Sequence, residues 1–325
     1  MEQSNFNVQF RLENHSESVF CSTKLKDGRF ATGSKDKSII IYNKKTFKPD
    51  LTIKEHNDFV ICIIQLSSGE LASSSNDRTI KIYNINENEY QVIQILEYHT
   101  DSIWKILELK NKQLISCSRD NWDNSMIFYC KNNNKYIKDY SISTNGLNGP
   151  VIHVNDDEIC FGEQSNICFY NLIERKIISI INNIHFSSYS NDTLIMITKD
   201  LLLVAGRNKF SIINVNSHNL IRIINVVNSS YIYCTCLLNE NMLLTGDYNK
   251  RILIWKIEGD NLRLISKKEN AHDNSIFTLL KLGNDQILSG SDDNFAKIWK
   301  LKNNWILKFD IEWQNFWIKN NLVII

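Results

Sequence analysis

The sequence predicts an all-β fold made of seven copies of one β-rich unit. Residues 56–84 hold three short apolar or alternating runs, at 60–66, 70–74 and 79–83, joined by turns rich in Ser, Gly, Asn and Asp. Such runs are typical of the strands of a β-meander. Related segments begin near positions 15, 56, 99, 143, 185, 228 and 272. A period of about 41–44 residues is typical of propeller blades, so we predict a seven-bladed β-propeller of four-stranded antiparallel blades.

A polar signature marks the best-preserved units. An aspartate follows a histidine by 21 residues, a serine or threonine lies four residues before the aspartate, and an aromatic residue lies six after it. In the third unit, three extra residues within 121–125 are placed after the aspartate. The units that begin near 143 and 185 keep the strand pattern and lose this signature. The predicted members are His15, Thr32, Asp36 and Tyr42; His56, Ser73, Asp77 and Tyr83; His99, Ser116, Asp120 and Tyr129; and His272, Ser289, Asp293 and Trp299.

With these sets at fixed spacing in four units, the chain resembles the WD-repeat family of β-propellers. The resemblance implies that each set forms a buried hydrogen-bonded network that ties one blade together. The Trp-Asp pair of the family is absent, because the aromatic residue is followed by Asn, Cys or Lys, as in Tyr83-Asn84 and Trp299-Lys300. Tyrosine also combines an apolar ring with one hydrogen-bonding group, so it can take the same structural role.

The repeated His, Asp and Ser sets do not predict catalysis. A catalytic site would occur once, whereas a structural network occurs in every well-preserved blade. The sequence also contains no Gly-rich phosphate loop, His-Glu-x-x-His pair or nucleophile elbow. We therefore predict a protein that is not an enzyme and that holds no cofactor or metal.

The two ends of the chain compete for one place in the ring. Residues 6–12 alternate between apolar and polar side chains and are expected to cross to the last blade and close the ring. Residues 305–313 alternate equally well directly after the seventh unit. The tail then either packs over a seven-bladed ring, which we favour, or begins a short eighth blade. In both cases residues 1–325 form one predicted domain.

Composition narrows the setting of the protein. The net charge of +1 gives no argument for nucleic acid as a partner. The sequence shows no signal peptide and no apolar stretch of membrane-spanning length. The eight cysteines follow no disulfide or zinc pattern, and three of them recur at one repeat position, six residues after the histidine. These features favour a cytoplasmic, or alternatively nuclear, protein.

The resemblance places partner-binding residues on the face that carries the histidines and aspartates, which we call the top face. The positions are the third and fifth after each histidine, or after Asn228, which takes the histidine position in the sixth unit, and the residue before each aspartate. The predicted residues are Phe20, Phe59, Ile61, Trp104, Tyr231, Tyr233, Phe277, Lys35 and Arg119.

From these positions we expect a scaffold or adaptor that binds other proteins, with an extended peptide anchored near Trp104 and Arg119. A substrate-recognition subunit of a ubiquitin ligase is the alternative. An enzyme with a site in the central channel ranks lowest.

Overall fold

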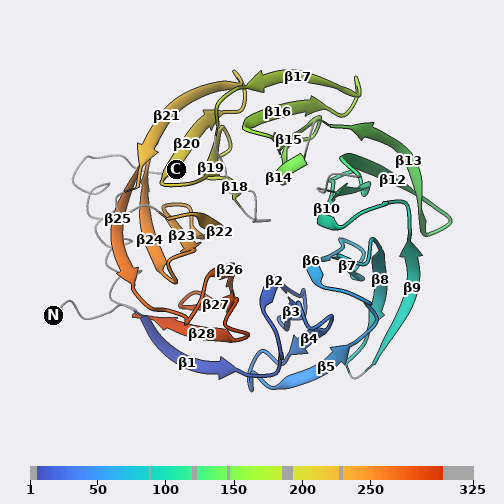
Figure 1. Ribbon diagram of the computed structural model, residues 1–325, viewed down its shortest axis with the longest axis vertical. Helices are drawn as coiled ribbons and strands as arrows, with labels where there is room; N and C mark the ends of the chain where they lie inside the picture. Colours follow the sequence, from blue (N-terminus) through green and yellow to red (C-terminus); the bar gives the residue numbers. More distant parts are fainter. Residues whose placement is uncertain are drawn as a thin grey trace, which may run out of the picture.

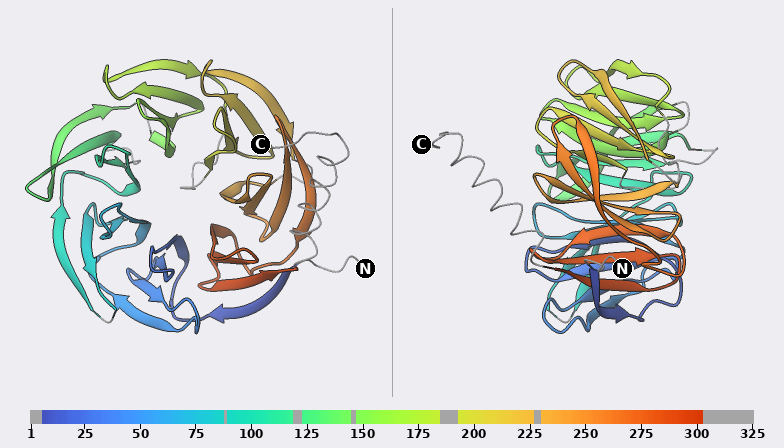
Figure 2. Two further views of the ribbon diagram at one scale, coloured as in Figure 1. Left: turned by 180° about the vertical axis from the view of Figure 1, so that it is seen from behind. Right: turned by 90° about the vertical axis from the view of Figure 1, so that its left-hand side faces the viewer.

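The computed structural model describes residues 6–87, 89–118, 123–144, 147–184, 193–226 and 230–302. Within these ranges, 28 strands form seven four-stranded antiparallel sheets, which are arranged as a closed ring around a common central axis (Figure 1). The described residues hold no helix. The predicted seven-bladed β-propeller is confirmed. Figure 2 shows the ring from behind and from the side.

Each blade lies radially, with its first strand nearest the central axis and its fourth at the rim. Blade 1 contains β2 (Val19–Lys24), β3 (Phe30–Ser34), β4 (Ile39–Tyr42) and β5 (Pro49–Ile53). Blade 2 contains β6 (Val60–Gln65), β7 (Leu71–Ser75), β8 (Ile80–Ile85) and β9 (Tyr90–Leu96). Blade 3 contains β10 (Ile103–Glu108), β11 (Leu114–Ser118), β12 (Ser125–Asn132) and β13 (Lys135–Ser143).

The remaining blades repeat this order. Blade 4 contains β14 (Leu147–Asn155), β15 (Glu158–Glu163), β16 (Asn166–Asn171) and β17 (Lys176–Ile181). Blade 5 contains β18 (Leu194–Met196), β19 (Leu201–Ala205), β20 (Lys209–Asn214) and β21 (Asn219–Asn225). Blade 6 contains β22 (Ile232–Asn239), β23 (Met242–Asp247), β24 (Ile252–Glu258) and β25 (Asn261–Lys268). Blade 7 contains β26 (Ile276–Lys281), β27 (Gln286–Ser291), β28 (Ala296–Leu301) and β1 (Phe6–Leu12).

The N-terminal strand closes the ring, as its alternating pattern predicts. β1 is the outer strand of blade 7 and runs antiparallel to β28, with Phe6 opposite Leu301 and Leu12 opposite Ala296. The last blade is thereby built from both ends of the described chain. The competing segment at 305–313, and with it the alternative of an eighth blade, lies outside the described residues.

The apolar core is divided into seven clusters, and each cluster fills one seam between neighbouring blades. At the seam of blades 1 and 2, for example, Ile41 packs in one cluster with Val60 and Tyr83. A single blade cannot bury its apolar faces, so each blade depends on both neighbours for stability.

Small residues let neighbouring blades approach closely. A Cβ atom built on Gly246 would lie 2.7 Å from both Cys234 Sγ and Ile276 Cγ2, which belongs to the next blade. The recurring cysteine of the sequence pattern is buried at this contact. Cys234 Sγ lies 3.6 Å from the carbonyl oxygen of Ile276, and Cys21 makes the corresponding contact with blade 2. All eight cysteines are free thiols.

Candidate functional site

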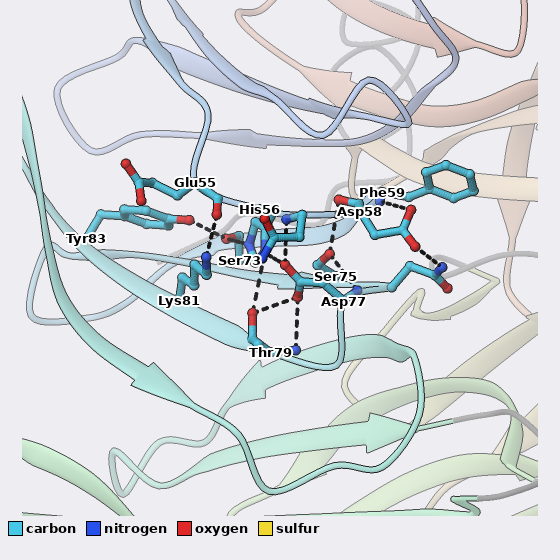
Figure 3. A network of polar contacts seen from close by, with 12 residues as sticks. Glu55, His56, Asp58, Phe59, Ser73, Ser75, Asp77, Thr79, Lys81 and Tyr83 are labelled. Atoms are coloured by element: carbon cyan, nitrogen blue, oxygen red, sulfur yellow. Dashed lines mark hydrogen bonds and ion pairs between the residues drawn. The ribbon is translucent and has the colours of Figure 1, made fainter.

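Blade 2 shows the predicted polar network in full (Figure 3). His56 Nδ1 donates to Asp77 Oδ2 at 2.8 Å, because a carboxylate can only accept. The other ring nitrogen, Nε2, lies 2.7 Å from Ser73 Oγ, which in turn lies 3.2 Å from the Tyr83 hydroxyl. Asp77 also accepts from the backbone N–H of Asn57 at 2.9 Å. The network therefore joins the loop before the blade to its second and third strands.

Blades 1 and 7 repeat the contacts of the histidine, whereas the buried Tyr42 hydroxyl of blade 1 lacks the hydrogen bond that Tyr83 makes in blade 2. His15 Nδ1 donates to Asp36 at 2.9 Å, and its Nε2 lies 2.8 Å from Thr32 Oγ1. In blade 7, His272 lies 2.8 Å from Asp293 and 2.6 Å from Ser289 Oγ. Trp299 Nε1 donates to the same Ser289 hydroxyl at 2.7 Å, so tryptophan replaces tyrosine without loss of the hydrogen bond.

Blade 3 corrects one predicted residue. His99 Nδ1 donates to Asp123 Oδ2 at 2.8 Å, and its Nε2 lies 2.6 Å from Ser116 Oγ. Asp123, rather than Asp120, is thus the carboxylate of this blade, and Asp120 lies outside the described residues. The three extra residues of this unit precede the aspartate instead of following it. The Tyr129 hydroxyl lies 2.9 Å from Ser116 Oγ, as the signature requires.

The network lowers the pKa of its carboxyl groups. Burial alone would raise the pKa of Asp123, but hydrogen bonds from His99, Ser125 and the backbone N–H of Thr100 lower it to about 2. Asp293 likewise has a pKa of about 2, since its hydrogen bonds and the attraction to His272 outweigh burial. The carboxylates are therefore ionised at neutral pH and accept strong, charge-assisted hydrogen bonds.

Blade 6 contains a substitute that the sequence pattern did not indicate. The Arg251 guanidinium pairs with Asp247, with Nε at 2.8 Å and one terminal nitrogen at 2.7 Å from Oδ2, and both side chains are buried. Trp255 Nε1 still donates to Thr245 Oγ1 at 3.0 Å. In the sequence, the feature that could have indicated this ion pair is an Asp and an Arg four residues apart, on either side of one turn. Blade 6 therefore contains a buried ion pair in place of the histidine and aspartate pair of blades 1, 2, 3 and 7.

These networks are structural and offer no substrate access. The hydroxyl residues Thr32, Ser73, Ser116 and Ser289 are fully buried, so a substrate could not reach them. Among the described residues, no three His, Cys, Asp or Glu side chains converge in an arrangement that could hold a metal ion.

β-Bulges in the inner strands set the direction of the fifth-position side chains. In β2, Val19 pairs with Ser34 and Cys21 with Gly33, so Phe20 is the extra residue between them. A bulge turns a side chain out of the regular alternation, and bulges often lie next to functional sites. The corresponding extra residues of the other inner strands are Ile61, Trp104, Tyr233 and Phe277.

Four blades contribute to one continuous aromatic surface, which we call the aromatic arc. Ring centroids lie 6.2 Å apart from Phe59 to Phe20, 5.0 Å from Phe20 to Phe277 and 5.5 Å from Phe277 to Tyr233. Tyr231 and Tyr248 extend it, each within 6.5 Å of the Tyr233 ring. The members of the aromatic arc are Phe59 of blade 2, Phe20 of blade 1, Phe277 of blade 7, and Tyr233, Tyr231 and Tyr248 of blade 6.

The predicted binding residues differ in how much surface they offer. Tyr231 is 38 % exposed, and Phe20, Phe59 and Phe277 are half-buried. Tyr233 is buried and forms the floor of the arc. Ile61 is 4 % exposed, so it offers almost no surface.

Trp104 of blade 3 is half-buried, and blade 3 adjoins blade 2, on which Phe59 forms one end of the arc. The expected peptide anchor at Trp104 stays a prediction. Arg119 lies outside the described residues.

Pairs of top-face residues close the seams between blades. The Ser18 hydroxyl donates to Asp292 across the seam of blades 7 and 1, and Ser102 donates to Asn76 across that of blades 2 and 3. These serines stand at the third position after the histidine, so this position also serves ring closure.

Where an aromatic residue stands at the third position, a cation covers it. Lys35 Nζ lies 5.1 Å from the Phe59 ring centroid, and the Arg207 guanidinium lies 5.1 Å from that of Tyr231. Arg207 was not predicted, because blade 5 lacks the aspartate that marks this position. The aromatic arc is thus flanked by one cation at each end.

Three matches to a family model agree with this geometry. The family described as WD domain, G-beta repeat matches residues 6–43, 47–84 and 265–300, which cover the three regular networks of blades 1, 2 and 7. The chain is a WD-repeat β-propeller. No curated protein matches the chain in sequence. Proteins of this family generally bind other proteins as scaffolds. No helix among the described residues is long and apolar enough to cross a membrane.

Proposed function

We propose that this WD-repeat propeller is a non-enzymatic scaffold or adaptor that binds partner proteins on its top face. The aromatic arc is the observation that carries the proposal. Partly exposed aromatic residues gathered in one patch are rare on proteins that bind nothing. Aromatic side chains also dominate the binding energy of interfaces, because they bury a large area at a small entropic cost.

The main anchor is placed on the arc. Phe20 and Phe277 project from bulges in adjacent blades, with their ring centroids 5.0 Å apart, so both can contact one partner side chain. Trp104 is proposed as a separate contact on blade 3. The alternative function is substrate recognition for a ubiquitin ligase, and it would use the same face. Lys35, at one end of the arc, suits a substrate that carries negative charge. A cytoplasmic or nuclear location stays a prediction.

Affinity purification from the native cell followed by mass spectrometry tests the proposal. The double variant Phe59→Ala/Phe277→Ala should lose partners that the wild-type chain retains. Phe10→Ala is the matched control, because Phe10 is 43 % exposed and lies on outer strand β1, away from the central axis. Retention of every partner by the double variant would overturn the top-face assignment. Recovery of ubiquitin-ligase subunits would favour the alternative.

A further inference from the structure

We propose that the aromatic arc binds an extended peptide that carries apolar side chains in its middle and a carboxylate toward each end. This inference rests on the proposed function, because it names the partner chemistry of the same surface. Three features support it: the length of the arc, the cations at its two ends and the carboxylate near its middle.

The dimensions of the arc fit a short extended segment. From Phe59 to Tyr231, five rings follow one another at centroid separations of 5.0–6.5 Å, across four consecutive blades. Along this path an extended chain of at most about seven residues fits, since each residue spans about 3.3 Å. Alternate side chains of such a chain recur at about twice this spacing, close to the spacing of the rings. A short peptide can therefore place apolar side chains over the partly exposed rings of the arc, which are Phe59, Phe20, Phe277 and Tyr231.

Each end of the arc offers an accessible cation. The Lys35 side chain is 41 % exposed, and its Nζ lies 3.7 Å from a carboxylate oxygen of Glu17. Arg207 is exposed, and among the described residues no carboxylate pairs with it. Both cations already lie over aromatic rings, so a peptide carboxylate would meet a positioned charge. The ends of the arc thus favour acidic residues.

The middle of the arc disfavours a further acid. The seam at which Phe20 meets Phe277 also holds Asp292, whose carboxylate accepts from Ser18 and, at 2.8 Å, from Asn274. A peptide carboxylate placed there would face a like charge and two apolar rings. The peptide is therefore predicted to be acidic at both ends and apolar in the middle. A uniformly basic surface would instead favour acidic residues along the whole peptide.

A selection experiment tests the pattern. A displayed library of random peptides of about nine residues is selected on the wild-type propeller, with Phe20→Ser/Phe277→Ser as the counter-selection. The enriched peptides are expected to carry Asp or Glu on both sides of two or more apolar residues. Enrichment of basic or uncharged flanks would overturn the inference, and so would the failure of any peptide to enrich.

Charge reversal then assigns the two ends. A labelled consensus peptide is titrated by fluorescence anisotropy against Lys35→Glu and Arg207→Glu, with Lys45→Glu in the β4–β5 turn on the opposite face as the matched control. Each arc variant should weaken binding about two- to fivefold or more, and the control should not. A peptide with lysine at the corresponding end should regain the lost affinity, which a merely structural change would not allow. Equal binding by all three variants would refute the assignment.

The outcomes separate this inference from the proposed function. If Phe59→Ala/Phe277→Ala loses its native partners while peptide selection shows no acidic flanks, the scaffold function stands and the partner chemistry is wrong. If that variant retains every native partner, the top-face function fails as well.

Discussion

Removal of the Asp77 carboxylate should destabilise blade 2 strongly. This carboxylate accepts four hydrogen bonds, from His56 at 2.8 Å, from the Asn57 N–H at 2.9 Å, and from the Thr79 N–H and hydroxyl at 3.0 and 2.7 Å. Hydrogen bonds to a charged group contribute about 1.5–3 kcal/mol each, and they are not additive when they share one acceptor. We expect Asp77→Ala to lower the free energy of unfolding by about 3–5 kcal/mol, as for other broken buried charge pairs.

Urea unfolding at pH 7, followed by circular dichroism, measures this loss. Asp77→Asn keeps one acceptor oxygen for the turn and should lose less, about 1–3 kcal/mol. Asp157→Ala, in an exposed turn on the opposite face, should stay within about 0.5 kcal/mol of wild type. Hydrogen exchange should show the loss of protection concentrated in β7 and β8. A loss below about 1 kcal/mol for Asp77→Ala would refute the view that the network holds the blade together.

Three further predictions follow from the same geometry. Asp123→Ala should destabilise the protein about as much as Asp77→Ala while Asp120→Ala should change stability little, and the reverse order in urea unfolding would contradict the corrected assignment. Gly246→Ala should cost about 1–3 kcal/mol because its Cβ would overlap atoms of the next blade, whereas Gly283→Ala, with its nearest atom at 3.8 Å, should be tolerated. Stability should fall in acid: the folded pKa of Asp293, about 2, lies below its unfolded value of about 3.9, so its contribution is present above pH 4 and is lost as pH falls toward 2.

The sequence period predicts the fold because each blade must bury its faces against neighbours. The spacing of repeat starts gives the blade count, and the alternation in residues 6–12 gives the strand that closes the ring. Blade 5 was harder to place, since β18 is only three residues long and its unit lacks the polar signature. Even there, the continuous apolar run at Leu201–Ala205 coincides with β19, which is buried on both faces.

The site was less predictable because it depends on register and on contacts between blades. Asp120 has the expected spacing of 21 residues from His99, but Asp123 is the residue that bonds to His99. The sequence does not tell on which side of the aspartate the three extra residues fall. The Asp247 and Arg251 pair replaces the missing network of blade 6 with different residue types. Strand bulges give the fifth positions their direction, yet which rings touch depends on the order of blades around the central axis, as with Phe20 and Phe277.

Site-specific photo-crosslinking in the native cell tests the central claim most directly. A photoreactive phenylalanine analogue is placed at Phe59 or Tyr231 on the arc, at Phe10 on the outer strand, and at Ile173, which is 73 % exposed in a turn on the opposite face. We predict that the two arc positions crosslink to the same partner proteins and that the two control positions do not. Capture of partners from Phe10 or Ile173, with none from either arc position, would contradict the account.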